Sequence, residues 1–153
     1  MLKLSFLEIL VRGLPEAFIM ILATYAFANK KLDKKEYLTS SLVMALVVYL
    51  VRLLPINYGV HTILNVFVLI FLTFNINKID LIVGIKSSIL VLMLLFVCEG
   101  FNIWFIQNIL HRDLSVLYTS SADRIILGIP STILFAVIVI VYYLILSKKR
   151  KLR

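Results

Sequence analysis

The stretch LIVGIKSSILVLMLLFVCEGFNIWFIQNI, residues 81–109, decides the fold class of this chain. Only Lys86 and Glu99 are charged in it. A helix rises about 1.5 Å per residue, so about 20 residues cross a hydrocarbon core that is about 30 Å thick. The stretch is therefore long and apolar enough to predict a transmembrane helix.

The composition of the whole chain agrees with this interpretation. Of its 153 residues, 62% are hydrophobic and only 16% are charged, whereas a soluble domain carries about a quarter charged residues. A single cysteine, Cys98, excludes a disulfide scaffold. These numbers indicate an integral membrane protein and disfavour a soluble or disordered chain.

Four further apolar stretches resemble residues 81–109, and they cover residues 5–29, 37–55, 60–76 and 125–147. Five crossings of about 20 residues use about 100 residues, which leaves room for loops and tails only. A signal peptide is the alternative for residues 5–29, but Glu8, Arg12 and Glu16 interrupt that stretch. We therefore predict an all-α protein with a single domain, 1–153, containing five transmembrane helices.

The lysines and arginines predict the orientation of this bundle. With five alternating helices, eleven basic residues fall on one face: Lys30, Lys31, Lys34, Lys35, Lys78, Lys86, Lys148, Lys149, Arg150, Lys151 and Arg153. Basic residues concentrate in short cytoplasmic loops. We expect the N-terminus outside, the C-terminus inside, and a multi-pass protein of the cell membrane, in bacteria the inner membrane.

The ionisable side chains within the spans are the strongest functional signal. Glu8, Arg12 and Glu16 are spaced by four residues and form one helix stripe. Gly13 and Pro15 lie in the same stretch, where a membrane helix can bend. Because a charge near the membrane centre costs about 2.5–3.5 kcal/mol, each retained charge calls for a partner or a function.

The predicted topology gathers these groups in the outer half of the membrane. The expected ligand-binding site or buried charge network consists of Glu8, Arg12, Glu16, Arg52, Asn57, His61, Asn65, Glu99 and Asn102. We expect the two arginines to pair with the three glutamates, since unpaired charges are disfavoured in lipid. Either a water-accessible pocket open to the outside or a network that only fixes helix packing would account for this set.

Enzymatic chemistry finds little support in the residues. Two histidines and Cys98 on different segments are a poor supply of metal ligands, and the sequence has no glycine-rich phosphate loop or nucleophile elbow. Cys98 lies in an apolar run and is expected to be a small packing residue. We expect no catalytic activity, metal or cofactor. The basic residues cluster behind a span, which favours topology and anionic lipid over nucleic acid.

The run YLVRLLPINYGVHTILN, residues 49–65, together with residues 8–16, resembles a known class of membrane regions. It is similar to the multi-span N-terminal sensor regions of some Gram-positive histidine kinases, including peptide-sensing kinases of the accessory-gene-regulator type. Those kinases continue into a cytoplasmic dimerisation helix and an ATP-binding domain. This chain stops at Arg153, so the resemblance implies a stand-alone sensor module or a fragment.

Three functional hypotheses follow from these observations. The first is a sensor or regulatory subunit that binds a small or peptide ligand in the outward pocket and signals to a cytoplasmic or membrane partner. Gly13–Pro15 and Gly128–Pro130 would be its hinges. The second is a substrate-binding subunit or small oligomeric transporter, and the third is a structural or assembly protein. The expected partners are the lipid bilayer and a protein partner or a second copy of the chain.

Overall fold

The computed structural model describes residues 11, 13–54, 58–108 and 121–149, and within these ranges the chain is all-α. Five helices and no strands are present in the described part. They are α2 (Leu14–Phe27), α3 (Lys34–Leu53), α4 (Tyr58–Asn75), α5 (Leu81–Asn108) and α7 (Ser121–Lys148). The predicted fold class is confirmed at the level of helix content.

The helix boundaries differ from the apolar stretches for a local reason. The apolar stretch of α3 begins at Tyr37, but the helix begins at Lys34 because Asp33 caps it. The Asp33 carboxylate accepts hydrogen bonds from the Lys35 and Glu36 amides, which have no partner within the first turn of the helix. A hydropathy pattern therefore marks the apolar part of a helix and misses the polar turn at its start.

Two of the described helices are long and apolar enough to cross a membrane. These are α5 over its full length and residues Gly128–Lys148 of α7. The apolar helices Leu14–Phe27 and Val60–Asn75 are shorter, as far as the structure describes them. Length and composition alone thus single out α5 and α7.

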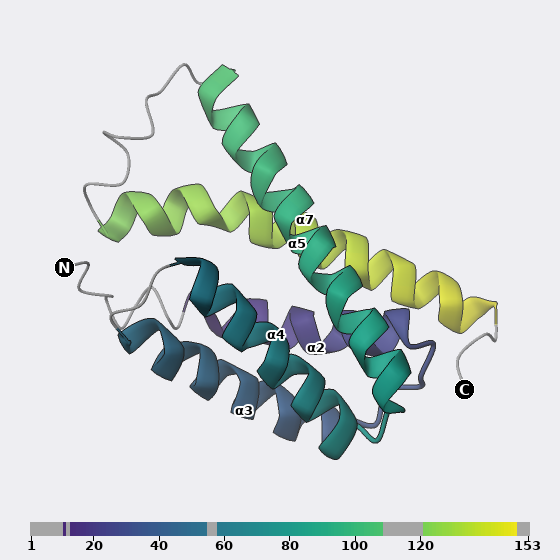
Figure 1. Cartoon of the computed structure of the whole chain (residues 1–153). Helices are drawn as coiled ribbons and strands as arrows, with labels where there is room; N and C mark the ends of the chain where they lie inside the picture. The colour runs from purple at the N-terminus through teal and green to yellow at the C-terminus, as the bar shows by residue number, and fades with distance from the viewer. Residues whose placement is uncertain (1–10, 12, 55–57, 109–120, 150–153) are drawn as a thin grey trace.

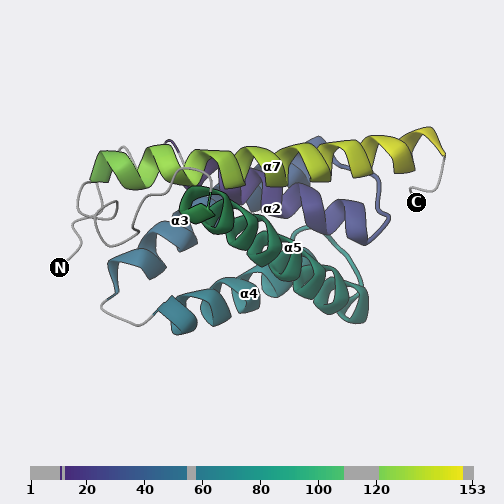
Figure 2. The same ribbon diagram turned by 90° about the horizontal axis from the view of Figure 1, so that it is seen from above.

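The connecting segments alternate between the two ends of the molecule. The loop of residues 28–33, the loop of residues 76–80 and the C-terminal end of α7 lie on one side in both views (Figure 1, Figure 2). We call this side the lysine end, because Lys30, Lys31, Lys34, Lys35, Lys78, Lys148 and Lys149 lie there. The start of α4 and the end of α5 lie towards the other end.

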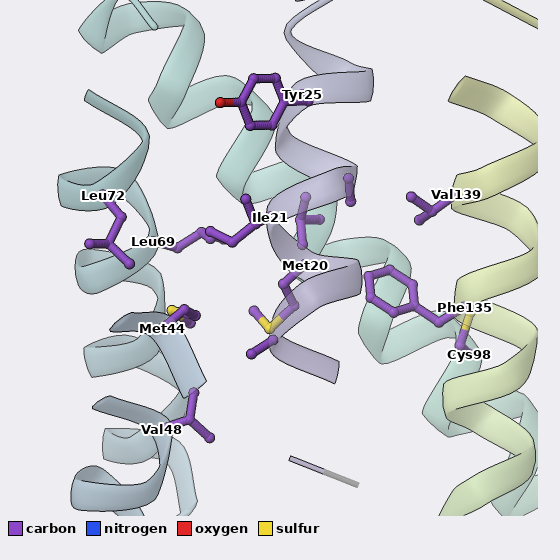
Figure 3. Packing of buried hydrophobic residues seen from close by; sticks show 13 residues of the cluster. Met20, Ile21, Tyr25, Met44, Val48, Leu69, Leu72, Cys98, Phe135 and Val139 are labelled. Atoms are coloured by element: carbon purple, nitrogen blue, oxygen red, sulfur yellow. The ribbon is translucent and has the colours of Figure 1, made fainter. Parts of the chain in front are cut away.

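Helix α2 is the central element of the fold. It packs against α3, α5 and α7, and it is apolar on all sides, as expected for a helix enclosed by neighbours. Figure 3 shows Met20, Ile21 and Tyr25 of α2 surrounded by side chains of the other four helices. Their main partners are Met44, Val48, Leu69, Leu72, Val91, Cys98, Phe135 and Val139. Cys98 is fully buried in this core, as predicted for a packing residue.

Apolar side chains occupy the surface of the described part as well as its core. Many large apolar side chains are exposed, and Phe67, Ile82 and Val97 each keep about two thirds of their surface accessible. Small polar residues lie inside, at helix contacts: Ser40, Ser41, Thr73, Ser87, Ser88 and Ser131. Small residues at helix interfaces allow the close backbone approach that is typical of helices packed in lipid.

Helices α4 and α5 meet at the lysine end and diverge away from it (Figure 1, Figure 2). The two helices are close together at Gly84, where a Cβ atom would lie in van der Waals contact with Cγ2 of Thr73, 3.4 Å away. Thr73 turns its hydroxyl back to the carbonyl of Leu69 and presents its methyl group to Gly84. Towards the opposite end α5 instead crosses α7.

The two expected hinges differ in their local structure. Pro15 lies in the first turn of α2, where its missing N–H has no partner to lose. Val11 and Gly13, just before it, have π-helical hydrogen bonding, a wider turn that often marks a bend. Pro130 lies inside α7, which continues through it. Beside it, the hydroxyls of Ser131 and Thr132 both donate to the carbonyl of Gly128.

Candidate functional site

Three of the predicted site residues bury polar atoms near the end opposite to the lysines. Glu16 lies in the first turn of α2, whereas His61 and Asn65 lie one turn apart near the start of α4. Glu16 Oε2, His61 Nδ1 and Asn65 Oδ1 are all buried. The Asn65 carbonyl oxygen has no hydrogen-bond partner among the described residues. The starts of α2 and α4 thus contain buried polar atoms among mostly apolar side chains.

Glu99 and Asn102 lie on α5 and are half-buried. Each makes at least one interaction, as do Glu16 and His61. Their helix diverges from α4 towards this end of the molecule (Figure 1). The structure therefore places the five described side chains of the predicted site towards the same end of α2, α4 and α5. The residues on α4 and those on α5 are separated there, because these two helices diverge.

The remaining predicted residues lie outside the described part or lack a described side chain. Glu8, Arg12 and Asn57 lie outside the described residues. Arg52 belongs to the last turns of α3, and its side chain is not described. The expected pairing of the arginines with the glutamates therefore stays a prediction.

A groove in the described part of the chain is apolar and does not coincide with the predicted polar site. It has a volume of about 450 Å³ and opens on the outer surface of α4 and the start of α5. Its lining consists of Phe67, Val68, Ile70, Phe71, Phe74, Asn75 and Leu81. None of the predicted site residues takes part in it.

The lysine end contains a second polar site that the sequence interpretation missed. Lys30, in the loop after α2, donates through Nζ to the backbone carbonyls of Asn77 and Lys78 in the loop after α4. Glu36, in the first turn of α3, forms ion pairs with both lysines. Its carboxylate oxygens lie 3.8 Å from Lys30 Nζ and 3.1 Å from Lys78 Nζ. We call Lys30, Glu36, Lys78 and the two carbonyls the loop clasp.

The loop clasp is continuous with the buried core and with α7. The fully buried hydroxyl of Tyr25 lies close to the Glu36 carboxylate. The amide of Leu32 donates to the Tyr143 hydroxyl of α7 at 3.1 Å, and the rings of Phe27 and Tyr142 are in tilted contact with centroids 5.4 Å apart. The clasp joins the α2–α3 loop to the α4–α5 loop, and the adjacent contacts of Leu32 and Phe27 join the α2–α3 loop to the end of α7.

Both loops of the clasp contain a residue with a left-handed backbone conformation. These are Asn29 and Lys78, with φ of 52° and 49°. After Asn29, the amide of Lys30 bonds back to the carbonyl of Tyr25, which is the six-to-one hydrogen bond of the Schellman motif that ends many helices. After Lys78, the amide of Ile79 bonds back to the carbonyl of Thr73, which lies one residue further away along the chain. Each left-handed residue turns its loop sharply and brings Lys30 and Lys78 towards Glu36.

Asp33 is the charged group of this end whose pKa is clearly displaced. Hydrogen bonds from the amides of Glu36 and Lys35 lower the pKa of the Asp33 carboxyl, since both bonds favour its ionised form. The positive end of the α3 dipole acts in the same direction. Asp33 is thereby held as a carboxylate that caps α3.

Asn77 is buried beside the clasp with a polar side chain that lacks partners. Its exposed fraction is zero, and neither amide atom has a hydrogen-bond partner within the described residues. Its backbone carbonyl, by contrast, receives Lys30. One sequence signal could have drawn attention to this place: asparagine at 75 and 77 with lysine at 78 ends a long apolar helix.

The comparisons with known proteins add no relative. No family model, no curated protein and no solved structure matches the chain. The described residues also contain no group of three or more histidine, cysteine, aspartate or glutamate side chains able to hold a metal ion. The resemblance to kinase sensor regions stays a prediction.

Proposed function

We propose that this chain is a multi-pass membrane sensor or regulatory subunit, with its lysine end in the cytoplasm and a ligand site at the opposite, outer end. The membrane placement is supported by the many large apolar side chains on the surface, because exposed apolar surface of this extent is unusual in a soluble monomer. The orientation is supported by the gathering of the lysines at one end.

One observation carries the ligand site: Glu16, His61 and Asn65 bury polar atoms at the helix starts opposite to the lysines. Buried polar atoms are costly in an apolar environment, and in membrane helices they commonly line a cavity or a ligand pathway. The ligand class that fits is a small polar molecule or a short peptide. In this proposal Glu8, Arg12, Arg52 and Asn57 complete the site.

The route of the signal is supported by the loop clasp. Lys30 and Glu36 join the α2–α3 loop to the α4–α5 loop. The hydrogen bond between Leu32 and Tyr143 joins the α2–α3 loop to α7. A ligand that contacts α2 and α4 differently in two states would shift the population of those states. The clasp would pass this shift to α7 and from there to a cytoplasmic or membrane partner.

Cysteine accessibility tests the outer site. In a Cys98→Ser background, Asn65→Cys should react with a charged, membrane-impermeant methanethiosulfonate added from outside. Leu69→Cys is the matched control, because it lies one turn further along α4 and is fully buried. Reaction of Asn65→Cys alone supports the site. If Asn65→Cys is as inert as the control in folded protein, the polar residues only pack and the proposal is wrong.

A second experiment separates a sensor from a carrier. A fluorophore on Lys149→Cys in proteoliposomes should respond to the extracellular peptide fraction of a culture, and Asn65→Leu should remove the response. No labelled peptide should accumulate inside the vesicles. Accumulation that Asn65→Leu abolishes would support transport, and the sensor proposal would then be wrong.

A further inference from the structure

Two of the three carboxylates described at the lysine end, Asp33 and Glu36, are engaged in internal contacts, and most of the lysines are not. Asp33 is committed to capping α3, and Glu36 lies between Lys30 and Lys78 with a fifth of its side chain exposed. Asp80 is the other carboxylate among the described residues of this end. Lys31, Lys34, Lys35, Lys148 and Lys149 are exposed.

The tertiary structure brings the two distant segments that carry these five lysines into contact at the lysine end. The hydrogen bond between the Leu32 amide and the Tyr143 hydroxyl fixes the loop of residues 28–33 against α7. Lys148 follows Tyr143 by five residues, which is about 7.5 Å along a helix. Figure 1 shows this loop and the end of α7 on the same side of the molecule.

The neighbouring surface is apolar. The rings of Phe27 and Tyr142 pack together beside the Leu32–Tyr143 contact, and Leu144 and Ile145 are exposed on the last turns of α7. A partner must therefore offer negative charge next to hydrocarbon. Anionic phospholipid has this chemistry, whereas nucleic acid and acidic peptides have charge without the adjoining apolar chain.

We propose that Lys31, Lys34, Lys35, Lys148 and Lys149 form one composite surface that binds phosphate headgroups of anionic phospholipids in the leaflet at the lysine end. The inference rests on the proposed membrane placement and is independent of the outer ligand site. The internal Lys30–Glu36–Lys78 contacts leave these five cations available. A lipid held by both segments would stabilise the contact between the loop and α7.

Native mass spectrometry of the full chain in a neutral detergent tests the proposal. The probes are phosphatidylglycerol, phosphatidylcholine of the same chain length, and inorganic phosphate. We expect phosphatidylglycerol to bind at least about tenfold more tightly than phosphatidylcholine, since each lysine near a charged headgroup is worth roughly fivefold in affinity. Inorganic phosphate should not displace it, because it lacks the acyl chains.

Two variants test whether the surface is composite. The loop variant replaces Lys31, Lys34 and Lys35 with Gln, and the helix variant replaces Lys148 and Lys149 with Gln. Each should remove most of the preference for phosphatidylglycerol, and combining them should cause little further loss. Lys86→Gln is the control, because Lys86 is exposed on α5 outside this surface, and it should keep the preference.

Three results would overturn the inference. These are equal binding of the two lipids to the unchanged protein, displacement of phosphatidylglycerol by inorganic phosphate, and retention by each variant of one bound phosphatidylglycerol at unchanged preference, as for two independent sites. Failure of the membrane placement is seen separately, as release of the chain from isolated membranes by alkaline carbonate. Near-native thermal unfolding of the variants shows that they fold, since all five replaced side chains are exposed.

Discussion

Replacing Lys30 with Met tests whether the loop clasp holds the lysine end together. The substitution keeps the length of the aliphatic side chain and removes the ammonium group that bonds the carbonyls of Asn77 and Lys78. A hydrogen bond to a charged group contributes about 1.5–3 kcal/mol. The bond to the carbonyl of buried Asn77 should contribute within this range, whereas the bond to the exposed carbonyl of Lys78 should contribute little. The long, partly exposed ion pair with Glu36, at 3.8 Å, adds at most about 1 kcal/mol.

The expected loss is therefore about 3 kcal/mol of unfolding free energy. For a chain of this length, 1 kcal/mol corresponds to about 2–4 °C in Tm, so Lys30→Met should unfold about 6–12 °C below the unchanged protein. The assay is thermal unfolding in a neutral detergent, followed by circular dichroism. Detergent without charge keeps lipid binding from contributing.

Lys31→Met is the matched control for this experiment. Lys31 is the next residue in the same loop, and its side chain is exposed. A surface substitution of this kind changes stability by no more than about 0.5 kcal/mol. If Lys30→Met and Lys31→Met unfold at the same temperature, the Lys30 contacts do not stabilise the fold and the reasoning fails.

Three further predictions follow from the described contacts. Tyr143→Phe removes the hydroxyl that accepts the hydrogen bond of the Leu32 amide and should cost about 1 kcal/mol in unfolding free energy. Tyr142→Phe keeps its ring contact and should cost less. Equal losses in the two variants would contradict the stabilising role of the Tyr143 hydroxyl. Gly84→Leu should destabilise the α4–α5 contact by about 1–3 kcal/mol, while Gly84→Ala should be close to neutral, and equal melting temperatures would refute the close approach. The pKa of the Asp33 carboxyl is lower in the folded chain than in the unfolded chain, where it is near 4. The ionised carboxylate that caps α3 therefore stabilises the fold at pH values above the unfolded pKa. This stabilisation is lost as the pH falls through the folded pKa. Asp33→Asn should flatten this acid dependence of unfolding, and an unchanged pH profile would contradict the assignment.

The sequence was sufficient to predict the helices because hydropathy is a local property. Residues 81–109 and 125–147 correspond to α5 and α7 within a few residues. The packing role of Cys98 was also predicted correctly. The polar first turns of α3 and α7 were missed, since capping residues and charged turns lie outside an apolar stretch.

The candidate site was predicted only in part. The structure supports the placement of Glu16, His61 and Asn65 near one end, because helix position follows directly from sequence position. It does not draw α4 and α5 together there, since Gly84 and Thr73 bring the two helices into contact at the other end. A helix count cannot reveal a crossing angle, which depends on such small side chains.

The lysine end shows most clearly what each level decides. The sequence by itself determined that the lysines lie on one side, because the number of helices between them fixes their side. Only the tertiary structure decided that Lys30 bonds the carbonyls of Asn77 and Lys78, forty-seven and forty-eight residues away. The physical reason is the left-handed turn at Asn29 and at Lys78, which directs both loops towards Glu36. Charge along a sequence thus predicts a side of the protein, whereas the partner of each charge depends on how the chain turns.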